Sequence, residues 1–184
     1  FKDMVKTLHK NNMELIMQFY FPKEFPCTEI LPILRYWHTE YHVDGFHLKG
    51  SNIPIYDVLK DPYLIHAKIW YESISKDMVG NVENEEVSKR CAIYNDMYLC
   101  NVRGFLKGDD RMLEPAIRCM LEQPEYYAKV NYLSNYYGFT FADMVAYQEK
   151  HNEANGEQNR DGSNYNCSWN CGVEGTTRKK DVLF

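Results

Sequence analysis

The stretch Tyr36–Gly50, YWHTEYHVDGFHLKG, changes its hydrophobic period half-way along, and this change decides the predicted fold. Apolar residues recur at helical spacing from Ile30 through Leu34 into the first half of the stretch, whereas Val43–Leu48 reads as a short buried strand. A helix that passes into a buried strand within one or two residues indicates a parallel α/β sheet. Lys49 then falls at the carboxyl end of that strand, the edge on which parallel α/β proteins build their sites.

The composition excludes several classes of partner. The 184 residues include 21 Lys and Arg against 26 Asp and Glu, a formal net charge of −5. The basic residues are dispersed, so we expect neither nucleic acid nor an anionic membrane as a partner. No apolar run approaches the roughly 18 residues of a membrane span. The six cysteines follow no disulfide or zinc-finger framework, so we expect reduced thiols, a cytoplasmic location, no metal and no cofactor.

The sequence around the same stretch resembles a known family. Arg35–Phe46, RYWHTEYHVDGF, resembles the helix and fourth barrel strand of the α-amylase superfamily, in its isoamylase and glycogen-debranching branch. Active members end this strand in Gly-Phe-Arg-Phe-Asp, and the final Asp is the catalytic nucleophile. This chain has Gly-Phe-His-Leu-Lys instead, so the resemblance puts Lys49 at the nucleophile position and His47 in place of the neighbouring Arg.

The most specific part of the resemblance lies near the carboxyl terminus. Tyr147–Gly162, YQEKHNEANGEQNRDG, and Ser168–Gly175, SWNCGVEG, are nearly letter-for-letter the loop of the debranching branch. Cys91–Asp110 also resembles a family segment, and we interpret it as a helix that ends at Gly108. The resemblance therefore runs in order from the first residue to about residue 175.

Other active-site positions follow from the resemblance. Glu72, at the end of the predicted strand Ala67–Glu72, falls on the general acid/base. Tyr136 and Tyr137 replace the family's sugar-binding His and third catalytic carboxylate. In the predicted strand Met13–Phe21 a polar pocket residue becomes a glutamine. The candidate substrate-binding residues are therefore Gln18, His47, Trp70, Tyr71 and Tyr136.

These substitutions change the expected chemistry. Retaining hydrolysis of a glycosidic bond needs two carboxyl groups about 5–5.5 Å apart. Lys49 is a cation, so we expect it to form an ion pair with Glu72 at the end of the adjacent strand. The aromatic candidates, Trp70 and the tyrosines, either stack on sugar rings or fill the core and its rim, because Tyr and Trp combine apolar bulk with a polar tip.

The predicted fold class is α/β, a partial (β/α)8 TIM-type barrel of four or five mostly parallel strands with outer helices. A complete barrel takes about 250 residues, so we interpret 1–184 as one excised or incomplete barrel domain with a long Asn-rich loop at 151–178. Its open sheet edges need a cover, from the remaining barrel segments, a second copy or its own loops.

Three functions stay open at this point. The first is a catalytically impaired debranching-type domain that is structural or binds α-glucan. The second is an active hydrolase of the isoamylase or pullulanase type, completed by segments outside this chain. The third is a protein-interaction domain.

Further predicted elements lie between these motifs. The pattern predicts a first helix that stops near Asn11, caps at Thr28 and Asn52, and a solvated segment at Ser75–Lys89. It also predicts the following helices and strand: Pro54–Lys60, Met112–Leu121, Val130–Ser134 as the strand, and Phe141–Lys150 with a capping box from Thr140 and Asp143.

Overall fold

The computed structural model of the chain describes residues 1–72, 89–122, 124 and 127–183. The predicted solvated segment 75–89 therefore lies almost wholly outside the described residues. The chain divides into two compact units. Unit 1 comprises Phe1–Tyr94 and Gln123–Val130, and unit 2 comprises Asn95–Glu122 and Asn131–Phe184. The single domain predicted for 1–184 stays a prediction.

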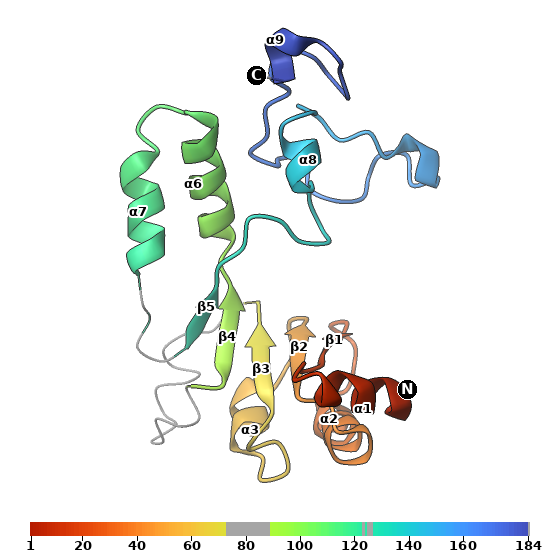
Figure 1. The fold of residues 1–184 in the computed structure, drawn as a ribbon. Helices are drawn as coiled ribbons and strands as arrows, with labels where there is room; N and C mark the ends of the chain where they lie inside the picture. Colours follow the sequence, from red (N-terminus) through yellow and green to blue (C-terminus); the bar gives the residue numbers. More distant parts are fainter. Residues whose placement is uncertain (73–88, 123, 125–126, 184) are drawn as a thin grey trace. The chain divides into compact units, whose positions relative to one another are not determined.

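Unit 1 is built on a parallel sheet (Figure 1). Its five strands are hydrogen-bonded in chain order and every neighbouring pair is parallel. The strands are β1 (Ile16–Tyr20), β2 (Gly45–Lys49), β3 (Lys68–Tyr71), β4 (Cys91–Tyr94) and β5 (Ala128–Val130). The prediction of an α/β fold with four or five mostly parallel strands and outer helices is confirmed, and the sheet is compatible with a partial (β/α)8 barrel.

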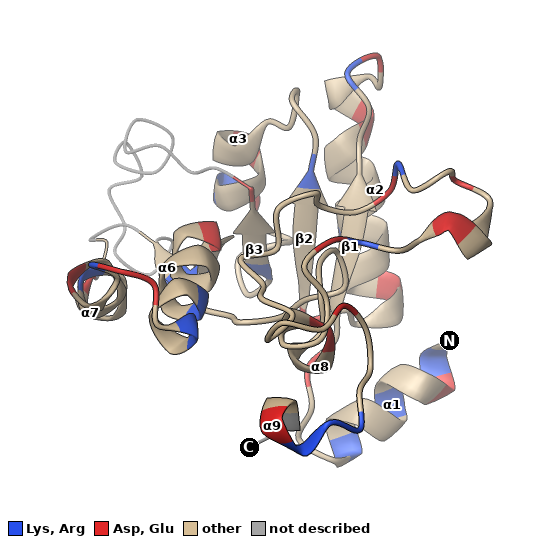
Figure 2. Cartoon of the chain, turned by 90° about the horizontal axis from the view of Figure 1, so that it is seen from above, with Lys and Arg blue, Asp and Glu red and all other residues tan. Residues whose placement is uncertain are grey.

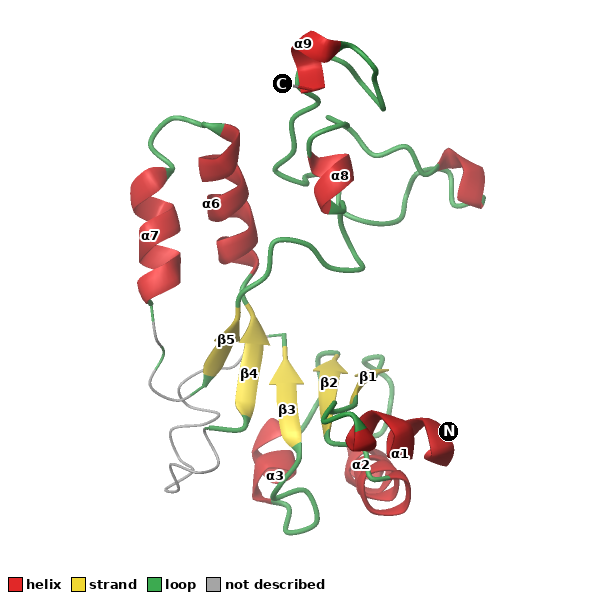
Figure 3. Cartoon of the chain, viewed as in Figure 1, coloured by secondary structure: helices red, strands yellow, loops and turns green. Residues whose placement is uncertain are grey.

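The two faces of the sheet differ sharply. On one face Phe46, Leu48 and Ile69 are fully buried and form a core with Ile30 and Leu34 of the second helix. The described helices of this unit are α1 (Lys2–Lys10), α2 (Cys27–Tyr41) and α3 (Ile55–Lys60), drawn in red in Figure 3. Successive residues of a strand point to opposite faces. The strand residues that alternate with these buried ones therefore share the other face of the sheet.

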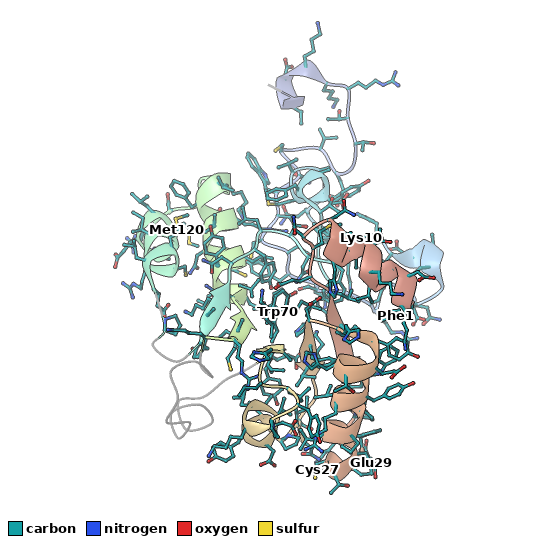
Figure 4. The ribbon with its side chains drawn as sticks, turned by 60° about the horizontal axis from the view of Figure 1, so that its bottom comes forward. Phe1, Lys10, Cys27, Glu29, Trp70 and Met120 are labelled. Atoms are coloured by element: carbon teal, nitrogen blue, oxygen red, sulfur yellow. The ribbon has the colours of Figure 1, made fainter. Side chains whose placement is uncertain are left out.

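Phe1 belongs to the helical layer as well. Its ring lies edge-on to Trp37 and Tyr41 of α2, with centroid separations of 5.4 and 5.5 Å, and Figure 4 labels it at the start of α1. Such aromatic pairs stabilise by about 0.5–1.5 kcal/mol beyond the area they bury. The contact fastens α1 to α2.

Unit 2 consists of helices and a long loop. Its helices are α6 (Asp96–Lys107), α7 (Leu113–Leu121), α8 (Phe141–Met144), the 3-10 turn Glu153–Asn155 and α9 (Lys180–Leu183). Asn95 caps α6 by accepting from the Tyr98 amide, and Gly108 ends it in the left-handed region at φ +83°. Pro115 is tolerated in α7 because it lies in the first turn.

A buried arginine holds the loops of unit 2. Arg103, on α6, is 1% exposed and donates to the carbonyl oxygens of Leu133, Phe139 and Asn166. The bonds from Nε to Leu133 and from Nη1 to Asn166 are both 2.7 Å long. One guanidinium therefore satisfies three carbonyls from two separate stretches of loop, and no other residue type carries that fork of donors.

Several predicted boundaries were wrong. β4 lies inside Cys91–Asp110, which we had interpreted as helical, because a four-residue buried run cannot be distinguished from helix by its period. The helix predicted to reach Lys150 ends at Met144, since the Met144 and Ala146 carbonyls accept from Trp169 and Gly175 instead. The strand predicted for Val130–Ser134 lies earlier in the chain, as β5, which ends at Val130.

The predicted helix caps had mixed outcomes. Pro26 and Pro54 occupy the N-cap positions that we had assigned to Thr28 and Asn52. The Asn52 side chain instead donates to the Lys23 carbonyl. The Thr140 cap is confirmed, since its hydroxyl oxygen accepts from the Asp143 amide.

Replacing Arg103 by Met is expected to lower the free energy of unfolding by about 3–5 kcal/mol. Each buried carbonyl left without a donor costs about 1–3 kcal/mol, and the new apolar contacts offset part of that cost. Urea denaturation of both proteins measures the difference. Arg118→Met, at an exposed position, is the matched control and should change the free energy by less than about 0.5 kcal/mol. Equal effects would contradict the role given to Arg103.

Candidate functional site

The register of the sheet brings three candidate side chains into one row. Gln18 of β1 pairs with His47 of β2, and His47 pairs with Trp70 of β3. Paired residues of parallel strands point to the same face, which here is the face opposite the helix-covered core. Tyr20 pairs with Lys49 two residues nearer the carboxyl ends of the strands, and this pair forms the next row on the same face. Figure 4 labels Trp70 on the sheet.

The expected ion pair forms at the carboxyl edge of the sheet. Lys49, the last residue of β2, places its Nζ 3.2 Å from Oε1 of Glu72, which directly follows β3. Figure 2 colours the chain by charge, with a blue segment at the end of β2 and a red segment after β3. Glu72 is the only carboxylate that directly follows any of the five described strands. The Glu72 side chain is half exposed, so the pair adds little to stability, but it puts an ammonium beside this carboxylate where hydrolysis needs a second carboxyl.

His47 is enclosed by aromatic rings. Its side chain is 5% exposed, and its ring centroid lies 4.8 Å from that of Tyr94 and 6.5 Å from that of Trp70. Nε2 of His47 is buried and has no hydrogen-bond partner among the residues that the structure describes. Burial lowers the pKa of His47 below its ordinary value of 6.5, the positive charge of Lys49 lowers it further, and Glu72 opposes the shift. The surroundings of His47 therefore favour its neutral form, at the position where the resemblance puts an arginine.

Tyr71, one of the predicted binding residues, lies on the other face of the sheet from Trp70. It is buried on the helix-covered face, in register with Leu48, and its hydroxyl donates to the Gly50 carbonyl at 3.0 Å. Trp70 and Tyr71 are neighbours on one strand, so only one of them can reach the inner face, which is the face of the sheet opposite the helix-covered core. Tyr71 is core filling with a satisfied polar tip, not a residue that a sugar can reach.

The remaining predicted residues, Tyr136 and Tyr137, belong to unit 2. They lie on a loop whose tip is shaped by Asn135, because its Oδ1 accepts from the Tyr137 amide at 2.9 Å. Both side chains are exposed, by 69% and 59%. They line a cleft of about 560 Å³ whose opposite wall comes from the Asn-rich loop, including Asn152 and Asp161.

The Asn-rich loop is held by a carboxylate. Glu174 accepts from the backbone amides of Gln148 and Glu149, from the Asn170 side chain and from Nε2 of His151. These donors, with the Gln148 amide first, lower the pKa of Glu174 to about 2. Four donors on one carboxylate join separate parts of a loop that has little regular structure.

Among the residues that the structure describes, no group of three or more His, Cys, Asp or Glu side chains could hold a metal ion. None of the helices described here has the length and apolar character needed to cross a membrane.

Comparison with known proteins places the chain among debranching enzymes. It is 34% identical over 179 residues to a glycogen operon protein GlgX homologue of Mycobacterium tuberculosis, covering 84% of this chain and 24% of that protein. It is 35% identical over 179 residues to isoamylase 3, chloroplastic, of rice, covering 84% of this chain and 22% of that protein. The glycogen debranching enzyme of Serratia proteamaculans is 34% identical over 167 residues, covering 79% and 25%. This chain belongs to the isoamylase and glycogen-debranching branch of the α-amylase superfamily. No family model matches it.

The debranching-branch chain spans about a quarter of the length of the curated relatives it matches. Within this span the structure has a parallel sheet, a row of polar and aromatic side chains on the face opposite the helix-covered core, and Glu72 at a strand end. The activity of the whole protein is therefore a matter for proposal.

Sequence reasoning missed three residues that shape the two sites. Tyr94 encloses His47, Arg103 fastens the tyrosine loop, and Glu174 fastens the Asn-rich loop. Tyr94 could have been found, since it ends an apolar four-residue run. The contacts of Arg103 and Glu174 join residues distant in sequence and leave no local pattern.

The chain is expected to lose stability as the pH falls below about 6.5. In the variant His47→Phe this loss is expected to be smaller. The pKa of His47 is lower in the folded chain than in the unfolded chain. Below about pH 6.5 the unfolded chain therefore binds the proton more readily, and protonation favours unfolding. Unfolding free energies measured by urea titration between pH 7.5 and 5 test this. His151→Gln should act with the opposite sign, because Glu174 raises the pKa of His151 and that contribution is lost as the pH rises. An unchanged pH dependence in His47→Phe would contradict the assignment.

The Gln148 amide proton is expected to report the titration of Glu174, with a midpoint near pH 2. The stabilising contribution of the ionised carboxylate is complete above its ordinary pKa of 4.5 and is lost as the pH falls toward about 2. NMR chemical shifts of the Gln148 and Glu149 amides measure it. Glu174→Gln should abolish the titration, while Glu157→Gln in the same loop should leave it unchanged. A midpoint near 4.5 in the wild-type chain would show that the four donors do not act on Glu174.

Proposed function

We propose that this chain is a debranching-type glycoside hydrolase domain whose own hydrolytic chemistry is disabled. Its ancestry is that of the α-1,6-glucan debranching enzymes, and the observation that carries the proposal is the Lys49–Glu72 ion pair of 3.2 Å. In the resemblance these two positions are the nucleophile and the acid/base. A carboxylate pair has become an ion pair.

The charge reversal is large enough to decide the activity. A unit charge about 4 Å from the reacting carbon interacts with it by about 4 kcal/mol at an effective dielectric near 20, so replacing a carboxylate by an ammonium changes the interaction by about 8 kcal/mol. That corresponds to about a millionfold in rate, before the loss of the covalent step is counted. Tyr137 at the third carboxylate position deepens the deficit.

Two described carboxylates of unit 1, Asp44 and Asp61, are already engaged elsewhere. Asp44 accepts from the Leu15 amide at 2.7 Å and from His9 at 2.9 Å, at the amino edge of the sheet. Asp61 is buried and accepts from Arg35 at 2.8 Å. Both have structural roles away from the carboxyl edge. The competing proposal is therefore a hydrolase completed by a carboxylate from outside this chain, because the chain spans only about a quarter of its relatives.

Substrate class and location follow the same proposal. The names of the relatives mention glycogen debranching and isoamylase, so an α-glucan is the ligand we propose. We also propose that the open sheet edges are covered by the remaining barrel segments or by a second copy. The cytoplasmic location stays a proposal, and the rice relatives carry the word chloroplastic in their names.

Incubation with an activated fluoroglucoside that traps covalent glycosyl-enzymes is expected to leave this chain unlabelled, since Lys49 cannot form the ester intermediate. Intact-mass spectrometry of the longest available form of the protein measures labelling, and an active isoamylase is the positive control. Release of reducing ends from glycogen and pullulan is measured in parallel. A labelled carboxylate together with turnover would establish the competing proposal, and peptide mapping would identify the nucleophile.

A further inference from the structure

Two thiols of unit 2 lie in contact although they are 67 residues apart in the sequence. Cys100 of α6 and Cys167 of the Asn-rich loop share a side-chain hydrogen bond. Both are free thiols, and Cys167 is 3% exposed while Cys100 is half-buried. The two sulfur atoms of a disulfide are about 2.05 Å apart, so sulfur atoms already in hydrogen-bond contact need only a small further approach.

Backbone contacts hold the two segments together independently of the thiols. Arg103 lies three residues after Cys100 and therefore on the same face of α6. Its Nη1 donates to the carbonyl oxygen of Asn166 at 2.7 Å, directly before Cys167 in the chain. Asn166 is itself buried, and its Oδ1 accepts from the Phe139 amide at 3.1 Å. The proximity of the two thiols is therefore fixed by the packing of this unit.

The backbone of Cys167 has an uncommon conformation. Its φ is +50°, in the left-handed region that only a few per cent of non-glycine residues adopt. Such a residue persists only where its surroundings hold it, and here the bonds to the preceding Asn166 do so. The sulfur of Cys167 is thus held beside the helix.

Cys171 is the competing partner for Cys167. It follows four residues later in the same loop, and both cysteines line a cavity of about 160 Å³. The Cys171 thiol, however, is directed to the Trp169 carbonyl, 3.8 Å away. The contact between thiols therefore favours Cys100 as the partner.

We infer that Cys100 and Cys167 are an oxidisable pair, which glutathione disulfide converts to a disulfide that fastens α6 covalently to the Asn-rich loop. The more exposed thiol, Cys100, loses its proton to solvent, and its sulfur attacks one sulfur of glutathione disulfide. That S–S bond breaks, and one glutathione leaves as a thiolate that takes up a proton. The deprotonated sulfur of Cys167 then attacks the sulfur of Cys100 and displaces the second glutathione, which is protonated in turn. Two protein thiols are oxidised, and one glutathione disulfide is reduced to two glutathione thiols.

The surroundings make this oxidation slow at neutral pH. Burial, followed by the hydrogen bond with Cys167, raises the pKa of the Cys100 thiol to about 12. Only the thiolate attacks a disulfide, so little of the reactive form is present at pH 7. The pair therefore stays reduced during a brief exposure to oxidant and forms the disulfide during a sustained one.

Equilibration of the chain at pH 8.5 in buffers of increasing glutathione disulfide content tests the inference. Peptide mapping by mass spectrometry without reductant is expected to find a Cys100–Cys167 link, with a loss of about 2 Da. The melting temperature of the linked chain is expected to rise by about 5–15 °C, because the link restricts the unfolded chain. Cys100→Ser and Cys167→Ser should each abolish the rise. Cys171→Ser in the same loop and Cys27→Ser at an exposed position are the matched controls and should keep it.

The wild-type mapping needs no variant, so a variant that folds poorly leaves the inference testable. A link between Cys167 and Cys171, mixed disulfides with glutathione alone, or free thiols throughout would each overturn it. A Cys100–Cys167 link that leaves the melting temperature unchanged would overturn the fastening of the loop. The inference does not rest on the proposed function, since both cysteines lie outside the positions that the resemblance assigns to catalysis.

Discussion

The close approach of β1, β2 and β3 at Gly45 is the constraint on which unit 1 depends. A Cβ at this position would collide with the Lys68 carbonyl oxygen and lie 2.7 Å from Cδ1 of Ile16, so only glycine lets the three strands meet in this register. The register then determines which side chains of neighbouring strands lie beside one another. It aligns Gln18, His47 and Trp70 across the inner face, and it places the end of β2 next to the end of β3.

Unit 2 depends in the same way on charged groups that satisfy loop backbone. Arg103 supplies donors to three carbonyls, and Glu174 accepts from two backbone amides. A long loop is stable only when its polar backbone groups find partners, and here side chains provide them where regular structure does not. The Asn-rich segment follows the same logic, since Asn159 exchanges hydrogen bonds with the backbone of Asn152 and Lys150.

These two devices explain how the family scaffold survives changes in its chemical residues. Gly45 and Arg103 act on backbone and do not touch the positions that the resemblance assigns to catalysis. In the resemblance, Lys49 and Tyr137 are the residues that change the charge of those positions. The ion pair at the strand ends compensates the new cation, and the aromatic rings around His47 accept a neutral imidazole where a guanidinium would need partners. Framework and chemistry are separable in this fold.

The sequence by itself determined the parallel α/β class and the position of Lys49 at a strand end, because hydrophobic period and strand boundaries are local properties. The pairing of Lys49 with Glu72 was predicted from the resemblance, which puts both residues at the ends of adjacent strands. Only the tertiary structure decided which of Trp70 and Tyr71 faces inward, since a shift of one residue in register exchanges the two faces. It also decided the enclosure of His47 by Tyr94 and the early end of α8 at Met144. Those features depend on contacts between residues far apart in the chain, and no local pattern in the sequence records such contacts.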